Sequence, residues 1–550
     1  MLENGKIWVA SSAEEKVYLN PSMANRHGLI AGATGTGKTV TMRVLAEAFS
    51  EMGVPVFFSD VKGDLSGTCL KGEDTDEMRE RIERFGIESW SYAAFPVRFW
   101  DIFGESGHKL RVTVSGMGPT LLSRLFGLTE VQAGVLNVVF RVADDHGLLL
   151  DDLKDLRQMV KYVGDNKAEF TTAYGNVTTA SIGAIQRALL AFEAEGGTEV
   201  FGKPELDIND WMTTDENGRG YINILAASRL IQSPTVYATF LLWMLSELYE
   251  KLPEVGDSEK PKMIFFFDEA HMLFDGANKA LVAKIEQIVK LIRSKGVGVY
   301  FITQTPSDIP SAVLAQLSNR VQHALRAYTP DEQKSIKAAA RAFRTDSVKQ
   351  TEETLKELGV GEALVSFLDE NGIPCMVQRA SILPPQSRMG AATPTKIAQV
   401  INSSEMEEKY RETNDRESAY EILVKAEETM AQEQAAAKEE AAAEKQRAAE
   451  EKALIKQQAA EEKARAKQEA AAAKAAAAKS KAIKSAGQKA VTSAASSVSR
   501  SVSTNIVNTL TGGKTVSAGT MAKRAATNAL SSLLRTGTTG ILRGLFGNKK

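Results

Sequence analysis

The sequence LIAGATGTGKTV, residues 29–40, joins an apolar run typical of a buried strand to a glycine-rich loop and to the beginning of a helical pattern. Its central residues fit the pattern G-x-x-x-x-G-K-[ST] without a departure. In such a loop the glycines let backbone N–H groups surround phosphate, and the dipole of the following helix adds positive potential. The residues predicted to bind nucleotide phosphates are Gly32, Ala33, Thr34, Gly35, Thr36, Gly37, Lys38 and Thr39.

Lys38 and Thr39 supply the charge and the metal ligand that this loop requires. We expect the Lys38 ammonium to reach the β- and γ-phosphates, and the Thr39 hydroxyl to bind Mg²⁺. A chance match of glycines is the alternative, but the apolar run before the loop and the helical pattern after it argue against chance. The sequence therefore predicts ATP as the bound nucleotide and Mg²⁺ as its metal.

Strand patterns alternate with helical patterns on the C-terminal side of the loop. This alternation predicts an α/β fold with a doubly wound sheet. Between about residue 65 and residue 215, apolar residues recur at helical spacing, which predicts a mostly helical insertion. Strands are expected at 7–9, 17–19, 29–31, 54–58, 221–225, 263–267, 299–302, 324–325, 363–367 and 375–377, and helices at 40–49, 235–250 and 279–294.

Composition divides the chain into three parts. Residues 1–402 have the composition of a globular protein, and we expect them to form the nucleotide-binding domain. Residues 403–480 are rich in Ala, Glu, Lys and Gln, which predicts a charged helix that is either a solvated spacer or part of a weak coiled coil. Residues 481–550 contain eleven Lys or Arg and no Asp or Glu, and their Ser, Thr and Gly content predicts a disordered basic tail. Nucleic acid, an anionic membrane surface and the acidic remainder of the chain are the candidate partners of this tail.

The sequence gives no sign of secretion or of a membrane span. Its first residues carry charge and glycine instead of an apolar signal core, and no run of about 18 apolar residues occurs. Cys69 and Cys375 are too few and too far apart in sequence for a disulfide framework or a metal cluster, so we expect reduced thiols. These observations predict a cytoplasmic protein with no transmembrane segment.

Two adjacent acids, Asp268 and Glu269, follow the apolar strand pattern at 263–267. A strand buried on both faces can present carboxylates only at its end, where the nucleotide crevice of a parallel sheet opens. We therefore expect Asp268 to bind Mg²⁺ and Glu269 to polarise the attacking water. The alternative is that Asp268 caps the next helix.

Gln304 ends the next strand pattern at the equivalent height. An amide at this position can contact both the γ-phosphate and the attacking water, although it can equally begin an ordinary loop. Arg293 and Arg320, before and after this strand, are candidates to stabilise charge on the γ-phosphate, with surface salt bridges as the alternative for each. Lys62 and Asp64 follow the second strand of the sheet and are expected at the same edge, with no role assigned.

Four segments together resemble the HerA/FtsK superfamily, and most closely the bacterial HerA-like predicted helicases of the YjgR type. These segments are Asn25–His27, Asp60–Asp64, Asp268–His271 and Thr303–Gln304, and the similarity covers about residues 1–400. The resemblance implies a RecA-like ATPase core in which Glu269 is the catalytic glutamate and Gln304 the polar sensor. It also implies a hexameric ring that encloses and pumps double-stranded DNA, with one family arginine acting within its own subunit and another from the neighbouring subunit.

The chain departs from this family pattern in two places. HerA has an N-terminal β-barrel that helps assembly and recruits a nuclease, whereas here the phosphate loop begins at Gly32, which leaves no room for a barrel and argues against a nuclease partner. The long helical insertion is the second departure, and the resemblance assigns it no role.

Two functions of different classes are compatible with these residues. The first is an oligomeric motor that translocates DNA through contacts with the phosphate backbone. The core is not basic, which counts against tight DNA binding, although net charge does not describe the charge of a pore. The second is a regulatory or scaffold ATPase that engages a protein or an anionic membrane through its C-terminal helix and basic tail. A small-molecule kinase is disfavoured, since Glu269 beside Asp268 suits the activation of water.

Overall fold

The computed structural model describes residues 1–484 except 88–89, 257, 275–278 and 327–328. The chain divides into two compact units, residues 1–423 and residues 424–550. The disordered tail predicted for 481–550 lies outside the described residues from 485 onward. Within the described ranges, no helix combines the length and the apolar character needed to cross a bilayer.

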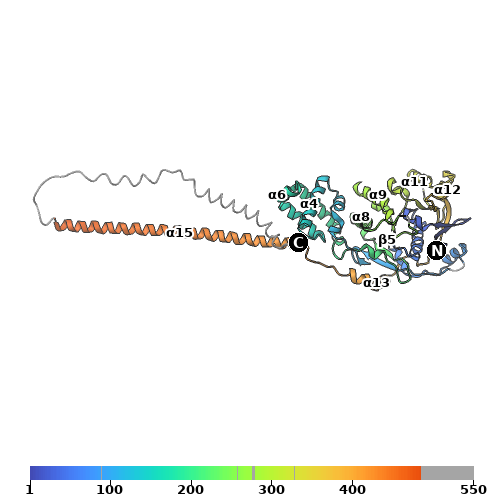
Figure 1. Ribbon diagram of the computed structural model, residues 1–550, viewed down its shortest axis with the longest axis horizontal. Coiled ribbons are helices and arrows are strands. Elements are labelled where there is room, and N and C mark those ends of the chain that lie inside the picture. Colours follow the sequence, from blue (N-terminus) through green and yellow to red (C-terminus); the bar gives the residue numbers. More distant parts are fainter. Residues whose placement is uncertain (88–89, 257, 275–278, 327–328, 485–550) are drawn as a thin grey trace. The chain divides into compact units, whose positions relative to one another are not determined.

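A mixed β-sheet forms the centre of the first unit (Figure 1). Its parallel part has the order β11-β4-β10-β9-β5-β8-β6-β7, and the strands β12, β13, β2 and β1 extend it in antiparallel fashion beyond β11, with β3 beside β2. This is the doubly wound α/β core predicted from the sequence. The strands are β1 (Leu2–Glu3), β2 (Lys6–Ser11), β3 (Lys16–Leu19), β4 (Gly28–Ala31), β5 (Val56–Asp60), β6 (Val97–Asp101), β7 (His108–Lys109), β8 (Ile222–Ala226), β9 (Met263–Phe267), β10 (Val297–Thr303), β11 (Asn319–His323), β12 (Glu362–Ser366) and β13 (Gln378–Ile382).

The central strands are apolar on both faces because helices cover both faces. Side chains alternate between the faces along β9, so Phe266 shares a core with helix α1 (Lys38–Glu51) while Phe265 points to the opposite side. On that opposite side Phe265 lies with Phe57, their ring centroids 5.2 Å apart. The Tyr237 hydroxyl of helix α8 (Pro234–Lys251) is 2.8 Å from Ser59 Oγ, which places α8 on the face that α1 does not cover. Helix α9 (Lys279–Ile292) connects β9 to β10.

The region predicted as a helical insertion is mostly helical but also contributes to the sheet. It contains α2 (Asp76–Arg84), α3 (Val114–Leu125), α4 (Glu130–Asp145), α5 (Leu153–Asp165), α6 (Lys167–Tyr174) and α7 (Thr179–Ala194), and Figure 1 shows α4 and α6 in one helical group. The prediction missed β6, which pairs with β8. The strand was hidden by Arg98, which is buried, lies 3.7 Å from the centre of the Tyr221 ring and donates to Thr213 Oγ1 at 2.7 Å. The charged Arg98 side chain interrupts the run of apolar residues from which a buried strand is predicted.

Two short strands lie several residues away from where the sequence placed them. The strand expected at 324–325 is β11, and the strand expected at 375–377 is β13. The first prediction was wrong because β11 is rich in polar residues that are buried and hydrogen-bonded. Asn319, for example, donates to Met23 O at 3.0 Å.

The segment after the sheet does not begin a continuous helix at residue 403. Helix α13 (Pro394–Asn402) packs on the core of the first unit, and the C-terminal strap, which we define as residues 403–418, crosses β6, β7 and the start of α5. Short helix α14 (Met406–Tyr410) lies within this strap. Arg416 makes two hydrogen bonds to Asp151, at 2.6 and 2.9 Å, and Glu407 lies 3.0 Å from His108 Nδ1. These contacts attach the strap to the first unit.

The long helix α15 (Ala419–Lys484) follows the strap. Its first residues belong to the first unit, where the Tyr420 N–H donates to Asp155 at 2.9 Å. Every side chain at 431–478 is exposed, as the sequence of strong helix formers without large apolar residues leads one to expect. The weak coiled coil, which requires a second helix, stays a prediction.

Tyr410→Ala is expected to lower the free energy of unfolding by about 3–5 kcal/mol, which is the usual cost of truncating a buried aromatic side chain. Tyr410 is fully buried, its hydroxyl accepts the Asp207 N–H at 3.0 Å, and its ring meets Trp100 edge-on. Urea denaturation followed by intrinsic fluorescence measures the loss. Tyr420→Ala is the matched control, since that ring is 38% exposed, and it should cost under about 1 kcal/mol. Equal costs for the two variants would contradict the attachment of the strap.

Candidate nucleotide-binding site

The glycine-rich loop lies between β4 and α1, at the carboxyl edge of the parallel strands. It is tied to both neighbouring strands: the Gly32 N–H donates to Thr303 O at 3.3 Å, and the Ala33 N–H donates to Ala324 O at 2.9 Å. The crevice outside the carboxyl ends of strands is where open α/β sheets bind ligands. The loop therefore begins at the position that phosphate binding requires.

Glycine is needed in this loop for conformation and for space. Gly35 and Gly37 have φ of +77° and +115°, in the left-handed region that favours glycine. A Cβ on Gly32 would lie 2.5 Å from Cβ of His323. The Lys38 ammonium lies across the loop and donates to Gly32 O at 2.6 Å and to Ala33 O at 3.2 Å. Burial lowers the pKa of Lys38, which the nearby acids Glu269 and Asp268 partly oppose. The loop, the buried ammonium and Thr39 in the first turn of α1 fit the phosphates of a nucleotide with its Mg²⁺.

A buried polar layer under the loop was not found from the sequence. His323, at the end of β11, accepts the Thr41 hydroxyl proton on Nε2 at 2.8 Å and donates from Nδ1 to Glu362 O at 2.9 Å. Burial lowers the pKa of His323 to about 4, so the ring is neutral near pH 7. The Gly361 N–H donates to Thr36 O at 2.9 Å, which joins the loop to the turn before β12. A single sequence offers little signal for such a layer, because a lone histidine in a polar strand has many structural uses.

Asp268 and Glu269 follow β9, with only β10 between β9 and the strand that carries the loop. The Asp268 carboxylate accepts the Glu269 N–H at 2.9 Å, and burial raises the pKa of Asp268 to about 6. Neither residue supplies a side-chain cap to the short helix η6 (Ala270–Leu273), so the capping alternative for Asp268 has no support. The structure thus brings a buried carboxylate pair to the same edge of the sheet as Lys38.

Glu269 has an unusual backbone conformation, with φ of +47°. Left-handed φ in a residue other than glycine costs about 1–3 kcal/mol and is common at functional sites. The side chain is one-tenth exposed, and its Oε2 atom is buried without a hydrogen-bond partner among the described residues. An unsatisfied, strained acid at this edge has the properties of a residue that awaits a ligand.

The turn after β5 places Lys62 against Glu269. The Lys62 Nζ atom is 2.8 Å from Glu269 Oε1, and this ammonium lowers the pKa of Glu269 although burial opposes the change. Asp60 shapes the turn, since its carboxylate accepts the Gly63 N–H at 2.7 Å and the Leu65 N–H at 3.1 Å. Burial raises the pKa of Asp60 to about 7. The sequence placed Lys62 at this edge but gave no partner for it.

Gln304 and the two arginines lie where the sequence predicts relative to β10, but only Gln304 is near the loop. Gln304 is exposed and directly follows Thr303, whose carbonyl accepts the Gly32 N–H. Arg293 precedes β10 and therefore lies at the opposite, amino-terminal edge of the sheet. Arg320 donates to three backbone carbonyl groups near the start of β11, at 3.0, 3.1 and 3.4 Å. The structure brings neither arginine to the loop of its own chain, because each sits near the start of a strand and the site lies at the strand ends.

Arg326 is the arginine that follows the carboxyl end of β11. It is exposed, and its Nη1 atom donates to Lys356 O at 3.2 Å. Arg326 was not among the candidate site residues predicted from the sequence.

A cavity of about 250 Å³ lies beside the first turn of α1. Its wall includes Val40, Met78, Arg81, Pro385 and Met389. The Arg81 guanidinium donates to Ile382 O at 3.0 Å and lies against Gly361. Because Val40 follows Thr39 and Gly361 contacts the loop, this partly apolar cavity adjoins the phosphate site.

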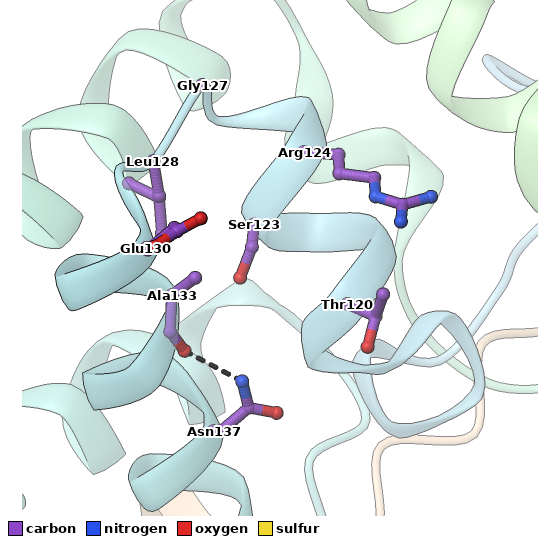
Figure 2. A pocket seen from close by; sticks show the side chains of 8 residues that line it. All are labelled: Thr120, Ser123, Arg124, Gly127, Leu128, Glu130, Ala133 and Asn137. Atoms are coloured by element: carbon purple, nitrogen blue, oxygen red, sulfur yellow. Dashed lines mark hydrogen bonds between the residues drawn. The ribbon is translucent and has the colours of Figure 1, made fainter. Parts of the chain in front are cut away.

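A second cavity, of about 390 Å³, lies in the helical group and is shown in Figure 2. It is formed by α3, α4 and the turn between them, with Ser123, Gly127 and Leu128 in its wall. Asn137 donates to Ala133 O of its own helix at 2.9 Å, and the Arg124 side chain points away from Ala133. Its polar groups do not converge on one point, so this cavity is not a candidate for the nucleotide.

Comparison with known proteins finds a family model and several similar proteins. The model of the family "Helicase HerA-like C-terminal" matches residues 6–516. The chain is 21% identical over 383 residues to the DNA double-strand break repair helicase HerA of Sulfolobus acidocaldarius, and 22% identical over 376 residues to the HerA of Saccharolobus solfataricus. Each match covers 66% of this chain and 66% of the relative, so the chain spans just under two thirds of the length of these relatives. Among solved structures, the plasmid coupling protein TrwB with ADP and Mg²⁺ aligns with a TM-score of 0.46 and 15% identity over 72% of this chain and 92% of that one.

Proposed function

Because the chain belongs to the family of helicase HerA-like C-terminal domains, we propose that it is an ATP-hydrolysing motor that acts on double-stranded DNA. One observation carries this proposal: the Lys38 ammonium and the carboxylates of Asp268 and Glu269 meet at one edge of the sheet, close enough for their charges to influence one another. A phosphate loop alone suits many nucleotide-binding proteins. A loop together with an acid pair at the neighbouring strand end suits hydrolysis.

Each group of the site has a proposed role in the reaction. The backbone of Gly32–Thr39 and the Lys38 ammonium bind the phosphates, and Thr39 and Asp268 hold the metal. Mg²⁺ held there would neutralise negative charge on the phosphates. Glu269 orients the attacking water and accepts its proton, and Gln304 contacts the γ-phosphate. The cavity beside Val40 is the place for the nucleoside.

The assembly and the partners are proposed from the family. We infer a ring, hexameric in the HerA/FtsK superfamily, in which Arg293 acts on the nucleotide of a neighbouring subunit and Arg326 on that of its own. Arg320 is better explained as a structural residue, since three carbonyl groups already accept its donors. Residues 1–402, together with the strap and the start of α15, form the ATPase domain, the rest of α15 is a solvated helix, and the tail supplies cationic charge for polyanions, DNA among them. A cytoplasmic location is also part of this proposal.

Duplex DNA is expected to raise the steady-state ATPase rate severalfold, because a translocating motor couples turnover to its track. The rate is measured at matched concentrations of duplex DNA and heparin, on protein whose mass in solution is known. Heparin is the control for simple polyanion binding and should stimulate less. A monomer with full turnover that is indifferent to DNA would contradict the motor. Stimulation by a protein or by anionic vesicles alone would favour the regulatory ATPase instead.

A further inference from the structure

Lys62 is the group at this site to which the proposed mechanism gives no role. It lies in the turn between β5 and the short helix η2 (Asp64–Cys69), and its ammonium is 2.8 Å from Glu269 Oε1. His271 Nδ1 is 3.6 Å from Oε2 and makes no hydrogen bond to it, and the Lys38 ammonium, although its charge is within range of this carboxylate, donates to Gly32 O and Ala33 O instead. Lys62 is thus the residue that fixes the position of Glu269.

The backbone that carries Lys62 is held firmly, whereas its side chain is not. Asp60 closes the turn from within through the Gly63 and Leu65 N–H groups, and the Asp64 carbonyl accepts Arg43 Nη2 at 2.7 Å. Arg43 is buried in α1, the helix that begins at the phosphate loop. The Lys62 side chain itself is 44% exposed. The backbone of Lys62 is therefore fixed relative to the phosphate loop, while the Lys62 ammonium can change its hydrogen-bond partner.

The γ-phosphate of bound ATP is expected to be a second partner for the Lys62 ammonium. The charges of Lys62, Lys38, Asp268 and Glu269 lie within range of one another. The γ-phosphate brings additional negative charge to the loop, and ADP does not. An ammonium paired with a carboxylate turns toward a nearby phosphate because the phosphate offers more negative charge and more acceptor oxygens.

We propose that Lys62 positions Glu269 in the nucleotide-free protein and moves to the γ-phosphate when ATP binds, which frees the Glu269 carboxylate to orient the attacking water. This proposal rests on the proposed function and deepens it, since it names a regulatory contact of the same site. Lys62 then distinguishes ATP from ADP. The pair with Lys62 also keeps the carboxylate from acting before the terminal phosphate is in place.

The test compares affinities for a non-hydrolysable ATP analogue and for ADP, measured by calorimetry with Mg²⁺. Lys62→Met keeps the length of the side chain and removes its charge. It should weaken analogue binding about tenfold, leave ADP binding within about twofold, and lower kcat about tenfold or more, on the scale of one lost charge-assisted contact. Lys62→Arg should restore most of both losses. Lys16→Met is the matched control, because Lys16 is 42% exposed and is paired with Glu3 at 2.7 Å, away from the site, and it should change neither affinity.

The possible results distinguish failure of the Lys62 proposal from failure of the proposed ATPase function. Equal weakening of both nucleotides by Lys62→Met would show a merely structural residue and overturn the proposal, as would unchanged affinity for both. In either case, nucleotide binding and hydrolysis by the wild-type protein would still support the proposed ATPase function. A wild-type protein that binds neither nucleotide would overturn both.

Discussion

Lys38→Ala is expected to abolish ATP hydrolysis, with kcat reduced at least about a thousandfold, and to weaken nucleotide binding. The substitution removes the buried ammonium that lies across the loop and leaves the backbone N–H groups alone to bind the phosphates. Steady-state phosphate release and calorimetric titration with ATP measure the two effects.

The fold should survive this change, because the side-chain hydrogen bonds of Lys38 within the described part of the chain go to the loop itself, at Gly32 O and Ala33 O. Circular dichroism and the urea midpoint check that point. Lys16→Ala, which removes an exposed ammonium from β3, is the control and should retain wild-type turnover. Wild-type turnover in purified Lys38→Ala protein would overturn the assignment of the site.

Glu269→Gln is expected to bind ATP and Mg²⁺ but to lower kcat by about 10²–10⁴-fold, the range for loss of a general base. The amide keeps the size of the side chain and an oxygen that can accept from Lys62, but it cannot take the proton of water. Single-turnover hydrolysis, measured beside nucleotide binding, separates the chemical step from affinity.

Asp268→Ala supplies the comparison, since the neighbouring acid is proposed to hold the metal. Its defect should shrink as Mg²⁺ is raised, whereas that of Glu269→Gln should not. If both variants respond to Mg²⁺ in the same way, the division of roles between the two acids is wrong.

The parts of the site that the sequence predicted are those in which local chemistry and strand order agree. The loop Gly32–Thr39 needs glycine for conformation, and Asp268–Glu269 must stand at a strand end because β9 is apolar throughout. Site residues of this kind can be predicted from the local sequence of a single segment. Gln304 was predicted on the same grounds, because it directly follows β10, whose last residue Thr303 accepts the Gly32 N–H of the loop.

The parts that the sequence missed depend on contacts between distant segments. Arg98 can form part of a buried strand because distant residues receive its guanidinium, among them Tyr221, Thr213 and Glu405. His323 lies under the loop because it is the last residue of β11, which ends directly before the strand predicted at 324–325, and its partners come from α1 and β12. The ion pair of Lys62 with Glu269 joins residues about two hundred positions apart, so no local pattern records it.

The C-terminal strap also decides where the chain can be shortened. The alanine-rich composition suggests a cut near residue 402, but a protein ending there would lose Tyr410 and Arg416 and so uncover Trp100 and leave Asp151 without its guanidinium partner. A soluble fragment for crystallisation is better ended within α15 beyond residue 430, where every described side chain up to 478 is exposed and a new terminus removes no packing. A recombinant ATPase made without the strap would then fail to express for reasons that have nothing to do with nucleotide chemistry.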